Sequence, residues 1–296
     1  MDSFSISDLS QYSGIQSHTI RIWEKRYDAL KPHRSSGNTR YYDSVQLKRL
    51  LNISALLKAD YRVSDLCTMS DEDLKSLSQQ ILQAKKPAPN EYFVSQLISA
   101  ALTYDESLFD SIFSHCLLKY GVKDTYTGVL YPALNRIGLL WLTDALPTSN
   151  EHFVSNLIRQ KLYTAIDSLA PAKPGSPLWV LFLPENEFHE IGLLLANYLI
   201  RLSGQRVIYL GGNMPESSVR SAVKDLHPEN IFLSFVHHDL ITNIQKYLDR
   251  LKRDIPVSKI WVAAHPDLCY QLKAGKRIQL LGSAEDLARM LGEQHV

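Results

Sequence analysis

The sequence has little of what would place a chain in a membrane or stabilise it outside the cell. Its 296 residues include only three cysteines, Cys67, Cys116 and Cys269, which lie far apart and form no CxxC pair. They predict neither a disulfide framework nor a cysteine metal site, so we expect reduced, buried thiols. No apolar run reaches the ~18 residues needed to span a bilayer. The first residues lack the basic and apolar regions of a signal peptide, and we therefore expect a cytoplasmic protein.

The sequence also lacks a strong net charge. Its 32 Lys and Arg are almost balanced by 31 Asp and Glu, which leaves a formal charge of +1. If the protein binds a nucleic acid, the positive charge for it must be concentrated in one part of the surface. The length favours two or three domains over a single core.

Two proline-containing stretches divide the chain. "KKPAPN" and "APAKPGSP" interrupt the helical patterns on either side of them, because closely spaced prolines cannot continue a helix. We expect a winged helix-turn-helix DNA-binding domain at 1–84, a four-helix bundle at 91–169 and an α/β domain at 178–296.

Apolar periodicity separates the second domain from the third. Helical spacing predicts bundle helices near 91–103, 105–119, 121–141 and 150–168. After the second linker come the short apolar runs "LWVLFLP", "RVIYLG", "NIFLSFV" and "KIWVAA", separated by helical patterns. Strands buried on both faces that alternate with helices predict a doubly wound, Rossmann-like parallel sheet. Ligands of such sheets bind beyond the carboxyl ends of the strands.

The N-terminal pattern predicts two helices and a wing. Ser5 is placed to cap the first helix, and Gly14 permits the tight turn that follows it. The second helix is expected near 17–26, the hairpin turn of the wing at Ser36-Gly37-Asn38, and a further helix after an Asp43 cap.

Positive charge gathers in this region. From Arg21 to Arg49 there are eight Lys or Arg and three acids, so the window carries +5. A basic helix followed by a basic wing is the electrostatic footprint of duplex binding. A solvated basic face on a small helical domain is the alternative, and the helix-turn-helix order argues against it.

The same stretch resembles MerR-family DNA-binding domains over about the first 70 residues. The matching motifs are Ile6-x-x-Leu9, Ser13-Gly14-Ile15, Thr19-Ile20-Arg21-x-Trp23-Glu24 and Arg34…Arg40-Tyr41-Tyr42. The resemblance implies that Arg21 contacts the major groove and that Arg34 and Arg40 hold phosphates. The expected DNA-binding residues are His18, Thr19, Arg21, Lys25, Arg26, Arg34, Asn38, Arg40 and Tyr42.

A histidine follows the first strand of the α/β domain, in "ENEFHEIG". Glu187 stands two residues before His189, where a carboxylate can accept the second N–H of the imidazole and orient the ring. Gly192 has no side chain, so the face of the following helix leaves room for a flat ligand. A lone histidine at a helix start is more often structural or simply exposed, and these residues alone leave that alternative open.

Glu187-x-His189-x-x-Gly192 resembles the DxHxxG signature of cobalamin-binding domains, and the likeness extends over about 178–293. Leu210-Gly211…Pro215 resembles the LGxxxP turn of these domains, and Ser234-Phe235-Val236 stands at their SxL position. The resemblance implies that His189 binds cobalt from the lower face, and that the dimethylbenzimidazole tail enters the sheet beside Ser234. These domains end their fourth strand in Gly-Gly, whereas this sequence has Ala263-Ala264, whose two methyl groups enter that wall.

The middle domain adds a third resemblance. Trp141, nine residues and then Glu151-His152 resemble the W-x9-EH pattern of CarH-like photoreceptor repressors. The resemblance implies a helical cap over the upper face of adenosylcobalamin, with Trp141 above the adenosyl group and Glu151 and His152 near it. If the resemblance is set aside, the alternative is that Trp141 is an aromatic residue of the hydrophobic core. Those relatives carry a histidine after the tryptophan. Leu142 stands there in this chain and cannot bind cobalt.

These patterns predict a DNA-binding transcriptional regulator, a repressor, whose oligomerisation and operator binding respond to cobalamin and to light. Its expected partners are a double-stranded DNA operator and further copies of the chain, in a dimer or tetramer formed through the C-terminal domains. One alternative is a regulator whose sensory module has lost cobalamin and serves oligomerisation or partner binding. A less favoured alternative is a corrinoid methyl carrier. We expect no enzymatic activity. The sequence shows no serine–histidine–carboxylate pattern typical of a hydrolase, and it lacks the lysine of a P-loop.

Overall fold

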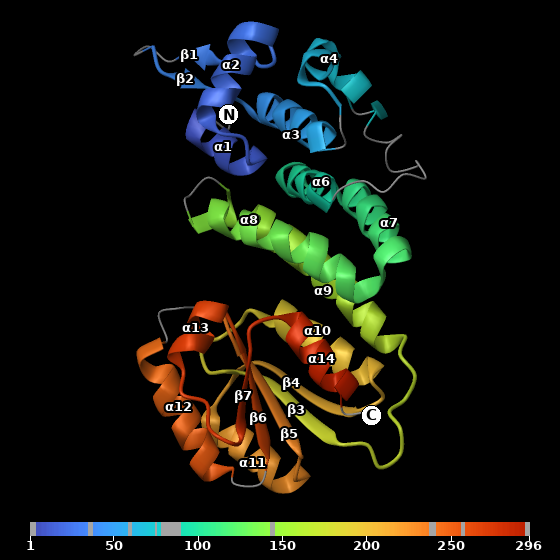
Figure 1. Ribbon diagram of the computed structural model, residues 1–296, viewed down its shortest axis with the longest axis vertical. Helices are drawn as coiled ribbons and strands as arrows, with labels where there is room; N and C mark the ends of the chain where they lie inside the picture. The colour runs from blue at the N-terminus through green and yellow to red at the C-terminus, as the bar shows by residue number, and fades with distance from the viewer. Residues whose placement is uncertain are drawn as a thin grey trace. The chain divides into compact units, whose positions relative to one another are not determined.

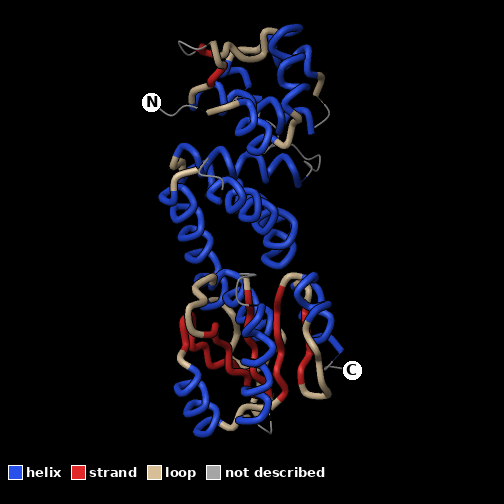
Figure 2. The backbone as a smooth tube through the Cα atoms, turned by 90° about the vertical axis from the view of Figure 1, so that its left-hand side faces the viewer, coloured by secondary structure: helices blue, strands red, loops and turns tan. Residues whose placement is uncertain are grey.

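The structure is a computed structural model that describes residues 4–34, 38–58, 61–74, 76–77, 90–142, 146–236, 241–255 and 258–293. Its contacts group the chain into two compact units, Met1–Leu157 and Ile158–Val296, and each is described by itself. Figure 2 shows helices throughout the middle of the chain and a sheet in the second unit. Among the described residues, no helix is long and apolar enough to cross a membrane.

The N-terminal domain contains the predicted helix-turn-helix and wing. Its elements are α1 (Ile6–Ser13), α2 (Ser17–Tyr27), β1 (His33–Arg34), β2 (Arg40–Tyr41), α3 (Ser44–Lys58) and α4 (Val63–Thr68). The predicted caps are confirmed. Ser5 and Asp8 form a capping box at α1, and Gly14 ends that helix at φ 70°. Asp43 accepts a 2.8 Å hydrogen bond from the Gln46 backbone N–H. β1 and β2 pair antiparallel, while residues 35–37 of the predicted hairpin lie outside the described ranges.

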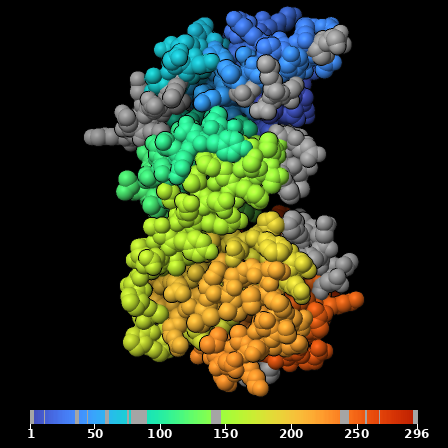
Figure 3. Space-filling view, turned by 180° about the vertical axis from the view of Figure 1, so that it is seen from behind, coloured from blue at the N-terminus to red at the C-terminus, as the bar shows by residue number. Residues whose placement is uncertain are grey.

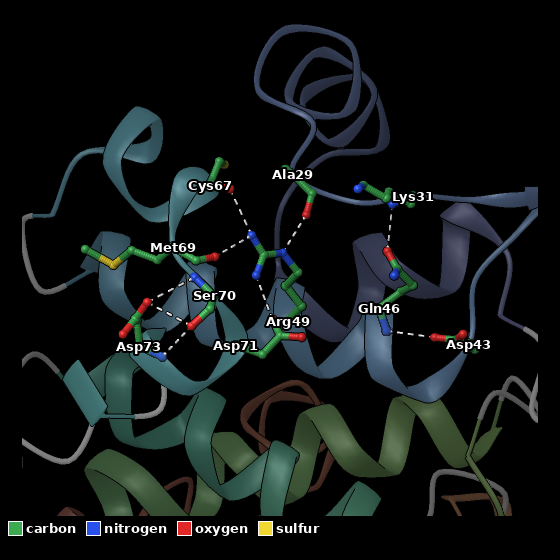
Figure 4. Close-up of polar contacts among 10 residues, drawn as sticks. All are labelled: Ala29, Lys31, Asp43, Gln46, Arg49, Cys67, Met69, Ser70, Asp71 and Asp73. Carbon is green, nitrogen blue, oxygen red and sulfur yellow. Dashed lines mark hydrogen bonds and ion pairs between the residues drawn. The ribbon is translucent and has the colours of Figure 1, made fainter.

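Arg49 on α3 ties α4 and the segment after it to the helix-turn-helix core (Figure 4). Its guanidinium donates to the carbonyl oxygens of Ala29 at 2.9 Å, Cys67 at 2.9 Å and Met69 at 3.0 Å. It also contacts the Asp71 carboxylate at 2.6 Å. The side chain is only 14% exposed, so Arg49 contributes more to the fold than to the basic surface counted from the sequence.

Replacing Arg49 with alanine is expected to lower the free energy of unfolding by about 2–3 kcal/mol, because three carbonyl oxygens and a carboxylate lose a charged donor. Urea unfolding followed by circular dichroism measures the change. Lys48→Ala, at the neighbouring position on α3, is the control. Equal losses in the two variants would contradict the role assigned to Arg49.

The middle region consists of α6 (Asn90–Thr103), α7 (Glu106–Thr125), the π-helix η1 (Tyr126–Leu130), α8 (Tyr131–Leu142) and α9 (Thr148–Asp167). The four predicted helical segments are confirmed. Gly121, at φ 73° and ψ 176°, is non-helical and divides α7 at the predicted boundary between the second and third segments.

Helix α6 joins the N-terminal domain to the bundle. It packs against α3 on one side and against α7 and α8 on others. Every residue from Tyr92 to Ala101 is buried, which is the pattern of a helix inside a core. Gln96 donates a buried 3.2 Å hydrogen bond to Asn52 of α3. Figure 3 shows blue atoms of the N-terminal domain directly against green atoms of the residues that follow it in the same unit.

The second unit contains the predicted doubly wound sheet (Figure 1). The parallel strands are β3 (Leu178–Pro184), β4 (Arg206–Met214), β5 (Asn230–Phe235), β6 (Lys259–Ala264) and β7 (Ile278–Leu281), in the order β4-β3-β5-β6-β7. The helices are α10 (Glu190–Leu202), α11 (Glu216–Leu226), α12 (Ile241–Asp254), α13 (Pro266–Gln271) and α14 (Ala284–Glu293). Residues of α11 and α12 share one core cluster with the sheet, and α10 and α14 pack together.

Candidate functional site

The predicted DNA-binding residues lie on α2 and on the wing. His18, Arg21, Lys25 and Arg26 are exposed along α2, and Thr19 is half-buried. Ile20 is fully buried and fixes the opposite face of the helix. His18, Thr19 and Arg21 fall in the first half of α2, the part of a recognition helix that reaches base edges.

The wing supplies three further exposed residues. Arg34 donates to the Asn38 side chain, and the Arg40 Nε lies 3.7 Å from the Glu24 carboxylate of α2. Tyr42 is placed differently from the other predicted contacts, because it is 0% exposed and its hydroxyl donates to Glu24. Burial and this hydrogen bond raise the pKa of the Tyr42 phenol. The side chain therefore packs inside the domain and holds the wing against α2.

The predicted contact between Glu187 and His189 is present at the end of β3. His189 Nδ1 lies 2.6 Å from Glu187 Oε1, and that oxygen also accepts the backbone N–H groups of Phe188 at 3.0 Å and His189 at 3.1 Å. The side chain of Glu187 is 0% exposed, whereas that of His189 is 48% exposed. If Nδ1 carries the proton donated to Glu187, Nε2 carries the lone pair that a metal requires.

The charge of Glu187 is held inside the protein by these contacts. Burial alone raises the pKa of a carboxyl, but the hydrogen bonds from the His189 ring and from the Val236 and His189 backbone outweigh it and lower the pKa to about 2. Glu187 is therefore ionised at neutral pH and favours a proton on His189 Nδ1.

Glu187 also connects the two loops where the strand order reverses. β3, the first strand of the sheet, lies between β4 and β5, so the connections after β3 and β5 leave the sheet in opposite directions. Such a switch point is where doubly wound sheets bind ligands. Glu187 Oε2 accepts the Val236 backbone N–H at 3.1 Å, directly after β5. Sequence reasoning missed this bond because it joins residues 49 positions apart.

The glycines near His189 have two different functions. A Cβ built on Gly192 meets nothing within 4 Å, so the first turn of α10 is open on that side. Gly211 has φ +83°, and a Cβ there would approach the Glu190 carboxylate at 3.1 Å. That carboxylate accepts the Gly212 backbone N–H at 2.9 Å, so the last part of β4 is fixed beside the start of α10. Sequence reasoning also missed this role of Glu190.

Ser234 is a buried polar group that needs a partner. It is 7% exposed, and its hydroxyl has no hydrogen-bond partner among the residues that the structure describes. It stands one residue before the end of β5. An unsatisfied buried hydroxyl costs about 1–3 kcal/mol. With the open turn at Gly192 and the orientation of His189 by Glu187, this hydroxyl fits a bound group that presents a metal and hydrogen-bonding atoms.

The two alanines predicted to crowd this wall point to opposite faces of the sheet. Ser234 pairs with Ala263 in the register of β5 and β6, and paired residues of neighbouring strands share a face. Ala264 packs against the core cluster formed with α11 and α12. Of the two methyl groups, only that of Ala263 lies on the face of Ser234. The sequence-based expectation of two methyl groups in one wall is corrected accordingly.

The predicted residues of the middle region lie near the ends of two helices. Glu151 and His152 occupy the first turns of α9, where His152 Nδ1 lies 2.7 Å from Glu151 Oε2. Trp141 and Leu142 end α8, and their side chains fall outside what the structure describes. The structure therefore brings Glu151 and His152 together, and the role of all three predicted residues toward a cofactor stays a prediction.

Comparison with protein families gives two matches. Residues 4–72 match the MerR HTH family regulatory protein, and residues 90–165 match the B12 binding domain. The first match covers the helix-turn-helix and wing. The second covers the four helical segments up to the last turn of α9.

Two curated relatives align along most of the chain. The chain is 25% identical to the HTH-type transcriptional repressor CarH of Myxococcus xanthus, over 98% of each chain. It is 29% identical to the HTH-type transcriptional repressor CarA of the same organism, over 78% of this chain and 76% of the relative. Among solved structures, the monomethylamine corrinoid protein of Methanosarcina barkeri superposes with a TM-score of 0.55 at 16% identity. It covers 69% of this chain and 99% of its own, and it shows the fold alone.

Proposed function

We propose that this chain, a CarH-like transcriptional regulator of the MerR family, represses transcription from a DNA operator under the control of bound adenosylcobalamin. The two curated relatives that align along most of the chain are named as transcriptional repressors. The observation that carries the proposal is the buried, ionised Glu187 that orients His189 at the switch point of the sheet.

The residues of the α/β domain have distinct roles in this proposal. When bound, adenosylcobalamin would supply a cobalt ion and a cobalt–carbon bond that light can break. His189 Nε2 would be the protein ligand to cobalt, and Glu187 holds the ring. Gly192 leaves room for the macrocycle, Gly211 permits the positive-φ backbone in the last part of β4, and Ser234 offers its hydroxyl to the cofactor. Trp141, Glu151 and His152 are proposed to contact the adenosyl side on the strength of the resemblance.

Control of DNA binding is proposed to act through self-association. Two or four copies, joined through their C-terminal domains, would place several helix-turn-helix domains on one operator. Linked domains bind with an avidity well above that of one domain, even though no base contact changes. Light is a further proposed signal, but Leu142 cannot take over a cobalt position, so a lit state with two histidines on cobalt is not expected.

Visible absorption after mixing with adenosylcobalamin in the dark and desalting tests the proposal. Wild-type protein is expected to retain the corrinoid, and His189→Ala to lose most of it. His227→Asn is the control, because it removes an imidazole at the end of α11 while asparagine tolerates the φ of 47° found there.

DNA binding completes the same test. Gel shifts with operator fragments, selected from random DNA by the protein itself, are expected to change with adenosylcobalamin for wild type and not for His189→Ala. Colourless wild-type protein that still binds DNA would refute cofactor control and favour a sensory module that serves oligomerisation alone.

A further inference from the structure

This inference rests on the proposed function, because a cobalamin bound through His189 needs a second place in the protein for its displaced lower base. In free cobalamin the lower position on cobalt is taken by a benzimidazole base, tethered to the macrocycle by a nucleotide arm. If His189 takes that position, the base and its arm need another place in the protein. Corrinoids without the base, such as cobinamide, carry no such requirement.

The carboxyl end of β5, which carries Ser234, is joined to the turn of His189 by Glu187. Glu187 orients His189 and also binds the backbone of Val236, two residues after Ser234. The Ser234 hydroxyl is more than nine-tenths buried and has no partner among the described residues. A nucleotide arm is rich in hydrogen-bonding oxygens and would satisfy it.

Ala263 is the neighbour of Ser234 on the adjacent strand β6. It pairs directly with Ser234 across β5 and β6 and is partly exposed. Its chain neighbour Ala264 belongs to the opposite face, where it packs with the cluster that includes Val262 and Phe235. The methyl group of Ala263 therefore lies on the same face as Ser234, whereas that of Ala264 lies on the opposite face, against the core cluster.

We propose that Ala263 is a specificity-determining residue that narrows the space beside Ser234, so that the chain prefers corrinoids with a small or absent lower base over cobalamin. Ala264 has no part in this selection. An extra methyl group in a packed site weakens binding by roughly five- to a hundredfold when the surroundings cannot adjust.

Two glycine variants and two probes separate these roles. Ala263→Gly and Ala264→Gly make the same chemical change at neighbouring positions of β6, and both place a glycine in a strand. Each variant and the wild type are titrated in the dark with adenosylcobalamin and with adenosylcobinamide, and bound corrinoid is followed by its visible spectrum. Circular dichroism confirms that each variant is folded.

The wild type is expected to bind adenosylcobinamide more tightly than adenosylcobalamin. Ala263→Gly is expected to tighten adenosylcobalamin at least fivefold and leave adenosylcobinamide within twofold, and Ala264→Gly to tighten neither. Equal affinities in wild type and both variants would overturn the role of Ala263 while leaving cobalamin control intact. A gain for both corrinoids, or in both variants, would also overturn it. Absence of binding by all three proteins would overturn this inference and the proposed function together.

Discussion

Glu187→Gln is expected to destabilise the α/β unit by about 3 kcal/mol at neutral pH, which is the free energy of a pKa lowered from 4.5 to about 2. An amide of the same shape loses the charge and directs N–H groups at donors that now lack an acceptor. Corrinoid affinity should fall roughly 10- to 100-fold, because the imidazole loses the group that orients it.

The stabilising contribution of Glu187 depends on pH, and this dependence can be measured. A carboxyl whose pKa is lowered on folding contributes stability that is fully present above its unfolded pKa of about 4.5. That contribution disappears as the pH falls from about 4.5 to about 2. Urea unfolding, followed by the fluorescence of the buried Trp179 and Trp261, should show this decline in the wild type and a flatter profile in Glu187→Gln.

Glu185→Gln is the matched control, because Glu185 lies on the same turn but is exposed. It is expected to retain both stability and corrinoid affinity. If the two variants unfold at the same urea concentration, Glu187 does not hold the loops together as described.

Arg21→Ala is expected to weaken operator binding by roughly 10- to 100-fold, a loss of about 1–3 kcal/mol for a residue that reads a base edge. Arg21 is exposed on α2 while its neighbour Ile20 anchors the helix, so the change leaves the fold intact. Fluorescence anisotropy with the selected operator and with scrambled DNA measures the effect. Discrimination between the two DNAs should fall as well as affinity.

Arg253→Ala, an exposed arginine on α12 in the other unit, is the control and is expected to change nothing. A loss in Arg21→Ala that is equal for operator and scrambled DNA would assign Arg21 to phosphates instead of bases. Equal binding by the two variants would remove Arg21 from the DNA surface.

Features that depend on a few neighbouring residues could be predicted from the sequence. The cap at Ser5, the turn at Gly14 and the contact between Glu187 and His189 each involve residues within three positions of one another, and the structure contains all three. The alternation of apolar runs and helical patterns also predicted the parallel sheet, because the strands of such a sheet are buried on both faces.

Features that depend on packing between distant residues could not be predicted. Tyr42 is buried because it reaches Glu24 on another helix, and its position in the wing motif carries no sign of that. The separation of Ala263 from Ala264 depends on the register with β5. β7 was missed because Ile278-Gln279-Leu280-Leu281 is short and polar at its second position, unlike the other runs.

The burial of α6 from Tyr92 to Ala101 limits how such regulators can be recombined. Tyr92 to Ala101 are all buried, and Gln96 donates a hydrogen bond to Asn52 of the DNA-binding domain. The boundary between the DNA-binding domain and the helical region is therefore a packed hydrophobic core. A chimera that joins this DNA-binding domain to a foreign sensor at the linker would leave the α3 side of that core without its complement. Exchange of the two parts therefore requires α6 to be transferred with α3, and natural recombination at this boundary meets the same obstacle.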